Sequence, residues 1–169
     1  MMGGAVRQIV PKPLRRDTWA PFGWLPVDDT DPSDGSNVLE FAWGDAHVNR
    51  IAHRRDEVAE VPGGLRCEVL FRHATHTQVL MPLDTVAVIV VAPAGLAMTG
   101  LSDVDEVRAF LIEPLASVVL HRGTWHWGPY PVGSDSVTLF NVQGRRYAED
   151  NTSADLAGAG IAVDVSLPE

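Results

Sequence analysis

The stretch Val86-Ala87-Val88-Ile89-Val90-Val91 decides how this chain folds. It is apolar at every position, whereas a strand with one face in water alternates apolar and polar side chains. A run of this kind, rich in β-branched residues, predicts a central strand that is buried on both faces. We therefore expect a sheet built around residues 85–92.

Short runs rich in Val, Leu and Ile flank this strand along the sequence, and Gly, Pro, Asp or Ser interrupts them. This pattern is typical of consecutive antiparallel strands. The predicted strands cover residues 65–71, 78–83, 85–92, 107–113, 117–121 and 136–142. Because 12 prolines and 15 glycines disfavour long helices, we predict only a short helix at 15–20 and one turn near 102–106. The pattern favours a mainly β sandwich or small barrel over βαβ units.

The composition excludes several classes of function. With 169 residues the chain is long enough for one domain with its own core, and its formal net charge is −9. Nucleic acids and anionic membranes select basic surfaces, so neither is an expected partner. The single cysteine, Cys67, is expected to be a buried structural thiol, and it allows no disulfide framework. The chain has neither an apolar membrane span nor a signal-peptide core, so we expect a cytoplasmic protein.

The segments outside the predicted strands carry much of the acidity. Half of the 22 acidic residues lie in residues 24–45 and in residues 149–169, and neither segment contains a basic residue. We interpret the first as solvated loops and the second as an acidic C-terminal tail. His47 and His53 stand among loop-like residues, and we expect no functional role for them.

The other four histidines form two clusters at the ends of predicted strands. His73 and His76 precede one strand, and His121 and His126 follow another. Gly123 permits a tight turn, which would bring His121 and His126 around one opening. Neutral imidazoles suit a borderline divalent metal and also suit acid/base chemistry near pH 7.

Arginines and tryptophans accompany both histidine clusters. Arg72 and Arg122 have the geometry to dock a carboxylate in bidentate fashion, and the alternative is an ordinary surface ion pair. Trp125 and Trp127 either wall a pocket or pack in the core. Together with Arg108, these arginines predict a locally cationic pocket for a small carboxylate inside an acidic chain.

Residues 65–143 resemble the ureidoglycolate lyase family, a cupin-like group of β-barrels in purine (allantoin) catabolism. The segments that carry the resemblance are Arg72-His73-x4-Gln78-x3-Pro82, Val88-Ile89-Val90-Val91, Val107-Arg108-Ala109-Phe110 and His121-Arg122-Gly123-x-Trp125-His126. Weaker matches are Trp19-Ala20-Pro21-Phe22-Gly23 and Asn49-Arg50. The resemblance implies a single cupin-like domain over residues 1–169, with an antiparallel β-barrel of the double-stranded β-helix type, and a homodimer.

The resemblance also implies an activity and a site. The activity is an amidine-type C–N lyase reaction that cleaves ureidoglycolate into glyoxylate and urea. His126 is the expected base or metal ligand, with His121 as its acid partner and Arg72 on the substrate carboxylate. The other expected substrate-binding residues are Gln78, Arg122, Trp125 and Trp127. The cupin pattern places a divalent metal (Ni, Zn, Fe or Mn) on His73, Gln78 and His126, and a metal-free site is the alternative.

Three positions depart from the family. Phe71 stands where the family usually has Glu, Trp127 where it tends to have a second histidine, and Gln143 close to a usual acid. These departures remove ionisable groups from the expected cavity. They leave open a divergent cupin-type isomerase, decarboxylase or dehydratase for a more hydrophobic hydroxy- or keto-acid. A non-catalytic, ligand-binding barrel is the third interpretation.

Overall fold

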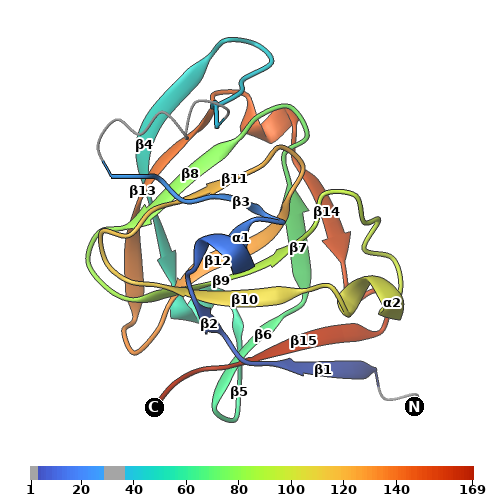
Figure 1. The fold of residues 1–169 in the computed structure, drawn as a ribbon. Coiled ribbons are helices and arrows are strands. Elements are labelled where there is room, and N and C mark those ends of the chain that lie inside the picture. Colours follow the sequence, from blue (N-terminus) through green and yellow to red (C-terminus); the bar gives the residue numbers. More distant parts are fainter. Residues whose placement is uncertain (1–3, 29–36) are drawn as a thin grey trace.

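The computed structural model describes residues 4–28 and 37–169, and they form three β-sheets stacked as layers (Figure 1). In spatial order, the outer sheet contains β1 (Ala5–Ile9), β15 (Ile161–Ser166), β6 (Gly64–Cys67) and β5 (Ala59–Val61). The middle sheet contains β14 (Thr152–Asp155), β7 (Val69–Arg72), β12 (Trp125–Pro131), β9 (Ala87–Ala92), β10 (Arg108–Ile112) and β2 (Lys12–Pro13). The third sheet, called the pocket sheet below, contains β3 (Gly23–Trp24), β11 (Val118–Leu120), β8 (Gln78–Pro82), β13 (Ser136–Gly144) and β4 (Ala46–Arg54).

Helices are few and short in the described chain. The α-helices are α1 (Arg16–Trp19) and α2 (Leu101–Val104), and the 3-10 helices are η2 (Arg55–Glu57) and η3 (Tyr147–Glu149). The prediction of a mainly β fold with one or two short helices is therefore confirmed. Most strand pairs are antiparallel as expected, but β1 with β15 and β2 with β10 pair in parallel.

Strand β9 is the buried central strand that its sequence predicts, and all six of its residues are buried. Val88 and Val90 pack in the core between the middle and outer sheets. Ile89 and Val91 pack in the core between the middle and pocket sheets. Successive side chains of a strand point to opposite faces, and here another sheet covers each face. An apolar residue is therefore required at every position.

The prediction of one strand over residues 65–71 is wrong. The chain is divided at Glu68 into β6 of the outer sheet and β7 of the middle sheet. The carbonyl oxygen of Glu68 accepts hydrogen bonds from the backbone N–H groups of Leu156 and Ala157. With Glu68 bound to this turn, the chain leaves one sheet and enters the next.

The sequence patterns do not predict β4, although it is one of the longest strands. Its side chains alternate between exposed and partly buried, and the inward row contains His47, Asn49, Ile51 and His53. Because that row is mostly polar, β4 lacks the alternation of apolar residues by which half-buried strands are recognised. The interpretation of His47 and His53 as loop residues is wrong for this reason.

The two acidic segments differ in the structure. Asp29, Asp31 and Asp34 of the first segment lie outside the described residues. The stretch 149–169 is not a solvated tail, because it contains β14 and the almost entirely buried strand β15. Asp164 of β15 is itself buried and forms an ion pair with Arg66 at 2.7 Å.

Two further expectations from the composition can be compared with the structure. Cys67 is buried within β6, and burial raises the pKa of its thiol, as expected for a structural cysteine. Among the helices of the described residues, none has the length and apolar character needed to cross a membrane.

Candidate active site

A cavity of about 420 Å³ opens between the middle sheet and the pocket sheet. Its lining includes Asn49, His53, Gln78 and Gln143 from the pocket sheet, Phe71, His126 and Tyr130 from the middle sheet, and His73, Tyr147 and Asn151 from the segments between strands. None of the described residues that line it is an acid, a lysine or an arginine. The charge of the cavity therefore depends on its histidines.

Strand alternation determines which side chains reach this cavity. On β12, His126 faces the cavity, whereas Trp125 and Trp127 pack in the core between the middle and outer sheets. The same rule separates Phe71, which lines the cavity, from Arg72 beside it. A step of one residue along a strand therefore decides whether a side chain can meet the ligand.

The tight turn at Gly123 contacts the other histidine segment. Gly123 has a φ of +79°, which favours glycine, and its N–H donates a hydrogen bond to the carbonyl of His73 at 2.8 Å. His126 follows this turn and reaches the cavity. His121 precedes it, is exposed, and packs its ring 5.5 Å from that of Trp24. The prediction that His121 and His126 share one opening is corrected, because the turn directs His121 away.

Backbone carbonyls fix the imidazoles of His73 and His126. Nδ1 of His73 lies 2.7 Å from the carbonyl oxygen of Asp150, and Nδ1 of His126 lies 3.2 Å from that of Thr124. A carbonyl oxygen only accepts, so each Nδ1 carries the hydrogen and donates it. Each neutral ring then keeps its lone pair on Nε2, which hydrogen-bonds to no described residue. Both rings line the cavity, so the lone pairs are available to a ligand.

Burial keeps these imidazoles uncharged. Desolvation lowers the pKa of His73, and it lowers the pKa of His126 to about 3 and that of His76 to about 4. The ring of His73 lies 4.6 Å from that of His76 and 5.3 Å from that of His126, so each charge would also repel the next. At neutral pH all three rings are neutral bases.

Asp150 organises the loop that carries His73 and His76. Its carboxylate accepts backbone hydrogen bonds from Ala74 at 2.9 Å and Thr75 at 2.7 Å, and a further one from the Thr75 hydroxyl. Although burial acts to raise it, these hydrogen bonds lower the pKa of Asp150 overall. The same carboxylate lies 3.6 Å from Nδ1 of His76. A residue distant in sequence thus positions the first histidine cluster.

A chain of amide side chains crosses the pocket sheet beneath the cavity. Nε2 of Gln78 donates to Oδ1 of Asn141 at 2.8 Å and to Oε1 of Gln143 at 3.2 Å. Nδ2 of Asn141 donates in turn to Oδ1 of Asn49 at 2.8 Å. The remaining atom, Oε1 of Gln78, is buried and has no hydrogen-bond partner among the described residues. A buried acceptor in this condition requires a partner, and a ligand in the adjoining cavity is one candidate.

The predicted arginines and tryptophans lie elsewhere. Arg72 places its guanidinium 4.4 Å from the ring centroid of Trp125 and donates to the carbonyl of Ala94, on the face opposite the cavity. Arg122 is half-exposed and pairs with Glu40 at 3.0 Å. The predicted cationic pocket is therefore corrected to a neutral one, and Trp125 and Trp127 take the core role that was their alternative.

Sequence reasoning missed several residues of the cavity and of the amide chain beneath it. Asn141 lies in a predicted strand, and counting by twos places it on the buried face with Val137 and Leu139. An asparagine in such an apolar row was the available signal. Tyr130 and Asn151 carried no comparable signal, because their segments were not expected to fold against the histidines.

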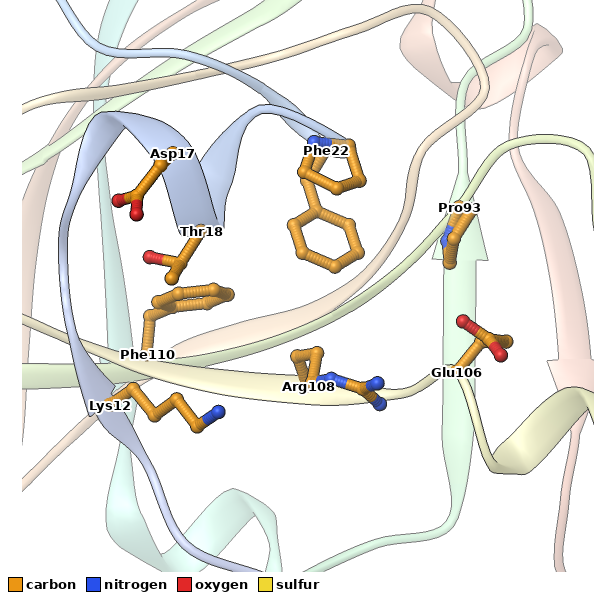
Figure 2. Close-up of a pocket in the computed structure, with 9 residues that line it drawn as sticks. Lys12, Asp17, Thr18, Phe22, Pro93, Glu106, Arg108 and Phe110 are labelled. Atoms are coloured by element: carbon orange, nitrogen blue, oxygen red, sulfur yellow. The ribbon is translucent and has the colours of Figure 1, made fainter.

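A second cavity, of about 260 Å³, lies beside α1 and β10 (Figure 2). Phe22 and Phe110 contribute apolar rings, and the charged side chains around them include Lys12, Asp17 and Glu106, which are exposed. None of the described residues lining it is a histidine or has a buried polar atom without a partner. The chemistry therefore concentrates in the first cavity.

The donors available to a metal ion are few. Among the described residues, no group of three His, Cys, Asp or Glu side chains is arranged to hold a metal. The rings of His73 and His76 are stacked at 18°, so their in-plane lone pairs run parallel and do not converge. The side chains of His73, His126 and Gln78, the set predicted from the sequence, line this cavity together.

The family model and the related protein sequences name one family. A family model described as ureidoglycolate lyase matches residues 6–163. A ureidoglycolate lyase of Pseudomonas syringae pv. syringae is 31% identical over 134 residues, which cover 72% of this chain and 74% of that protein. A ureidoglycolate lyase of Chelativorans sp. is 24% identical over 150 residues, covering 82% and 87%. Among solved structures, RmlC from Streptococcus suis in complex with dTDP-D-xylose has a TM-score of 0.40 and 15% identity, covering 78% of this chain and 54% of that one.

Proposed function

This chain belongs to the ureidoglycolate lyase family, and we propose that it cleaves ureidoglycolate into glyoxylate and urea. The observation that carries the proposal is the pair of neutral imidazoles, His73 and His126. Both have Nδ1 tied to a carbonyl and Nε2 available to the cavity. A positioned base of this kind is what elimination from a hydroxyl-bearing carbon requires.

His126 acts as the base in this proposal. Its Nε2 takes the hydroxyl proton while the O–H electron pair forms the carbonyl of glyoxylate and the C–N bond electrons leave with the ureido nitrogen. The imidazolium then returns the proton to that nitrogen, which completes urea. One histidine balances the reaction, so the exposed His121 is not needed as an acid.

Substrate binding makes His126 a stronger base. A free imidazole with a pKa of about 3 is a weak base, because burial disfavours its charged form. The substrate carboxylate brings a negative charge into a cavity that otherwise lacks one, and this raises the pKa of His126. His73 stays neutral and accepts a hydrogen bond from the substrate through Nε2.

Neutral donors take the place of the predicted arginines at the carboxylate. The hydroxyl of Tyr130 and the amide of Asn151 line the cavity together with Tyr147. Burial raises the pKa of Tyr130 to about 12, so its hydroxyl keeps its proton and donates it. These groups orient the carboxylate without adding charge.

The donor chemistry of one cavity fits a divalent metal, because the unpartnered oxygen of Gln78 and the imidazoles of His73 and His126 belong to residues that line it together. His73, His126 and Gln78 would hold the ion through Nε2, Nε2 and Oε1. Bound there, it would act as a Lewis acid on the hydroxy-acid oxygens.

The activity is tested by mixing the purified protein with ureidoglycolate and following glyoxylate release. We expect release well above the spontaneous rate, measured both with added divalent metal and after chelation. Release at the spontaneous rate under both conditions would contradict the proposal. Ligand binding without turnover would then support the non-catalytic interpretation.

A second candidate substrate class is favoured by the apolar side of the cavity. Phe71 and Ile51 face the ligand, with Phe71 at the position where the family usually has an acid. A more hydrophobic hydroxy- or keto-acid would bury these rings and methyl groups. A panel of such acids, assayed for isomerisation, decarboxylation and dehydration, separates this divergent enzyme from the lyase.

We also propose the homodimer that the family resemblance implies. Among the strands of residues 4–28 and 37–169, β4 lies at the edge of the pocket sheet and pairs only with β13, and it exposes Val48. An edge of this length is suited to strand-mediated association. Sedimentation or light scattering of the purified chain should give twice the mass of 18.3 kDa.

A further inference from the structure

The amide of Gln78 is held in one of its two orientations. Its Nε2 donates both hydrogens, one to Asn141 and one to Gln143. Turning the amide by 180° would place Oε1 against the same two oxygens, so both hydrogen bonds would be lost and oxygen would face oxygen. The observed orientation leaves Oε1 buried and without a partner among the described residues.

Asn141 is hydrogen-bonded in turn to the next strand. It is fully buried, and its Nδ2 donates to Oδ1 of Asn49 at 2.8 Å. With its nitrogen committed to Asn49, Asn141 presents only oxygen to Gln78. The orientation is thus transmitted from β4 through β13 to β8, along three neighbouring strands of the pocket sheet.

This arrangement has no evident benefit for folding. A buried acceptor without a donor disfavours the folded state, and apolar residues at these positions would avoid that cost. The same strands do carry apolar residues one inward position away, at Leu80 and Leu139. The unpartnered oxygen is explained if a ligand completes it.

We propose that Asn141, supported by Asn49, is a positioning residue that holds the Gln78 oxygen toward the cavity as an electron-pair donor. The proposal deepens the proposed function and depends on it for the substrate. The group that binds this oxygen must accept an electron pair. It is either an N–H group at the ureido end of the substrate or a divalent cation. Together with His73 and His126, Gln78 then presents three lone pairs to one ligand.

The orientation can be observed directly by NMR, since even the proposed homodimer contains only two chains of 18.3 kDa. The side-chain NH₂ signals of Gln78 are assigned by their loss in Gln78→Met. In the wild type we expect both hydrogens to be protected from exchange with water. In Asn141→Leu we expect protection to fall about 2- to 10-fold, the range for one lost hydrogen bond.

Control variants separate positioning from loss of structure. Val137→Ala changes an inward residue of the same strand in the apolar core, and it should leave the Gln78 signals and kcat/KM of the folded protein unchanged. Asn141→Asp keeps an oxygen toward Gln78 and should restore protection. If Asn141→Leu does not fold, Asn49→Ala removes the outer link of the chain and should lower protection in the same direction.

Two titrations distinguish the ligands. Urea, far below denaturing concentrations, represents the ureido group, and Ni²⁺ alone represents the cation. Whichever of them the wild type binds should bind at least about tenfold more weakly to Asn141→Leu and normally to Val137→Ala. Binding of urea assigns the oxygen to substrate N–H, and binding of Ni²⁺ assigns it to a metal.

Three results would overturn the proposal. These are unchanged protection of the Gln78 amide in Asn141→Leu, unchanged affinity of that variant, and no binding of either probe by the wild type. None of these readouts requires turnover. If ureidoglycolate is not cleaved but the amide and titration results hold, the proposed function fails while the positioning role of Asn141 stands.

Discussion

The space between the middle and pocket sheets has two ends, and the same strands fill them in opposite ways. At one end the inward residues of β13 are Val137 and Leu139, which join a core containing Trp19 and Phe110. At the other end the inward residues are amides and imidazoles around a cavity. The change occurs within β13 itself, between Leu139 and Asn141.

Strand β8 makes the same change, from Leu80 in the core to Gln78 at the cavity. Burial is similar at both ends, so exposure does not explain the difference. The apolar end stabilises the fold through removal of hydrocarbon from water. The polar end contains unpartnered atoms that folding alone does not favour, which is typical of a functional site.

The largest expected effect on activity is that of replacing His126, on the cavity face of β12. His126→Ala removes the proposed base and should lower kcat/KM about 100-fold or more, because general base catalysis contributes at least that factor. Glyoxylate release at several ureidoglycolate concentrations measures it.

The matched control is the next residue, which faces the core. Trp127→Leu should lower the free energy of unfolding while kcat/KM of the folded protein changes by less than about threefold. The assignment of the base would be wrong if His126→Ala kept activity within a few-fold of the wild type.

The next effect concerns the apolar end. Leu139→Ala leaves a cavity beside Leu80 and should reduce the free energy of unfolding by about 2–5 kcal/mol. Its effect on kcat/KM should be small, because Leu139 does not line the cavity. Urea denaturation measures the change, with Thr138→Ala on the other face as the control. A stable but inactive Leu139→Ala would show that the two ends do not act separately.

The polar end should make stability depend on pH. The folded pKa of His126 (about 3) and that of His76 (about 4) lie below the ordinary value near 6.5 in the unfolded chain. Between these values the unfolded state binds more protons, so stability falls as pH falls below about 6.5 and is flat above it. At pH 5 the loss is about 2 kcal/mol for each histidine.

Thermal unfolding from pH 7.5 to 5 tests this expectation. The pKa of Asp150 is lowered in the folded state, so its contribution to stability is lost only at more acidic pH. Asp150 therefore does not affect the change in stability between pH 7.5 and 5. Replacing His76 with glutamine should reduce the slope. A melting temperature that stays constant over this range would contradict the burial of neutral imidazoles.

The smallest expected effect concerns Arg72. Arg72→Met removes the contact with Trp125 and should cost about 1 kcal/mol of stability. Because Arg72 lies on the face opposite the cavity, kcat/KM for ureidoglycolate should stay within about threefold. A tenfold rise in KM would show that Arg72 binds the substrate. The two faces of the strand would then not have separate roles.

Much of the fold and part of the site could be predicted from sequence. The all-apolar stretch around Val88 predicted a strand covered on both faces, because no other environment suits six consecutive apolar side chains. The cupin pattern named His73, Gln78 and His126, and all three line one cavity. Gly123 also marked the tight turn between His121 and His126, although the turn does not bring them together.

Other residues were misassigned for a common physical reason. Arg72 and Trp125 are one residue away from true cavity residues, and on a strand one residue reverses the direction of a side chain. His121 lies only five positions before His126, but the turn at Gly123 separates them. Proximity in sequence therefore identified the segments that line the cavity. It did not identify which side chains on those strands point into the cavity.

The sequence by itself determined a mainly β chain with a buried central strand, and it named the imidazoles and the amide that could share a site. Only the tertiary structure decided that the cavity is neutral and that Asn49 and Asn141 orient Gln78. Strand patterns arise from local alternation, which a sequence records directly. The direction of an amide and the charge of a cavity depend on which strands become neighbours, and here those strands come from distant parts of the chain.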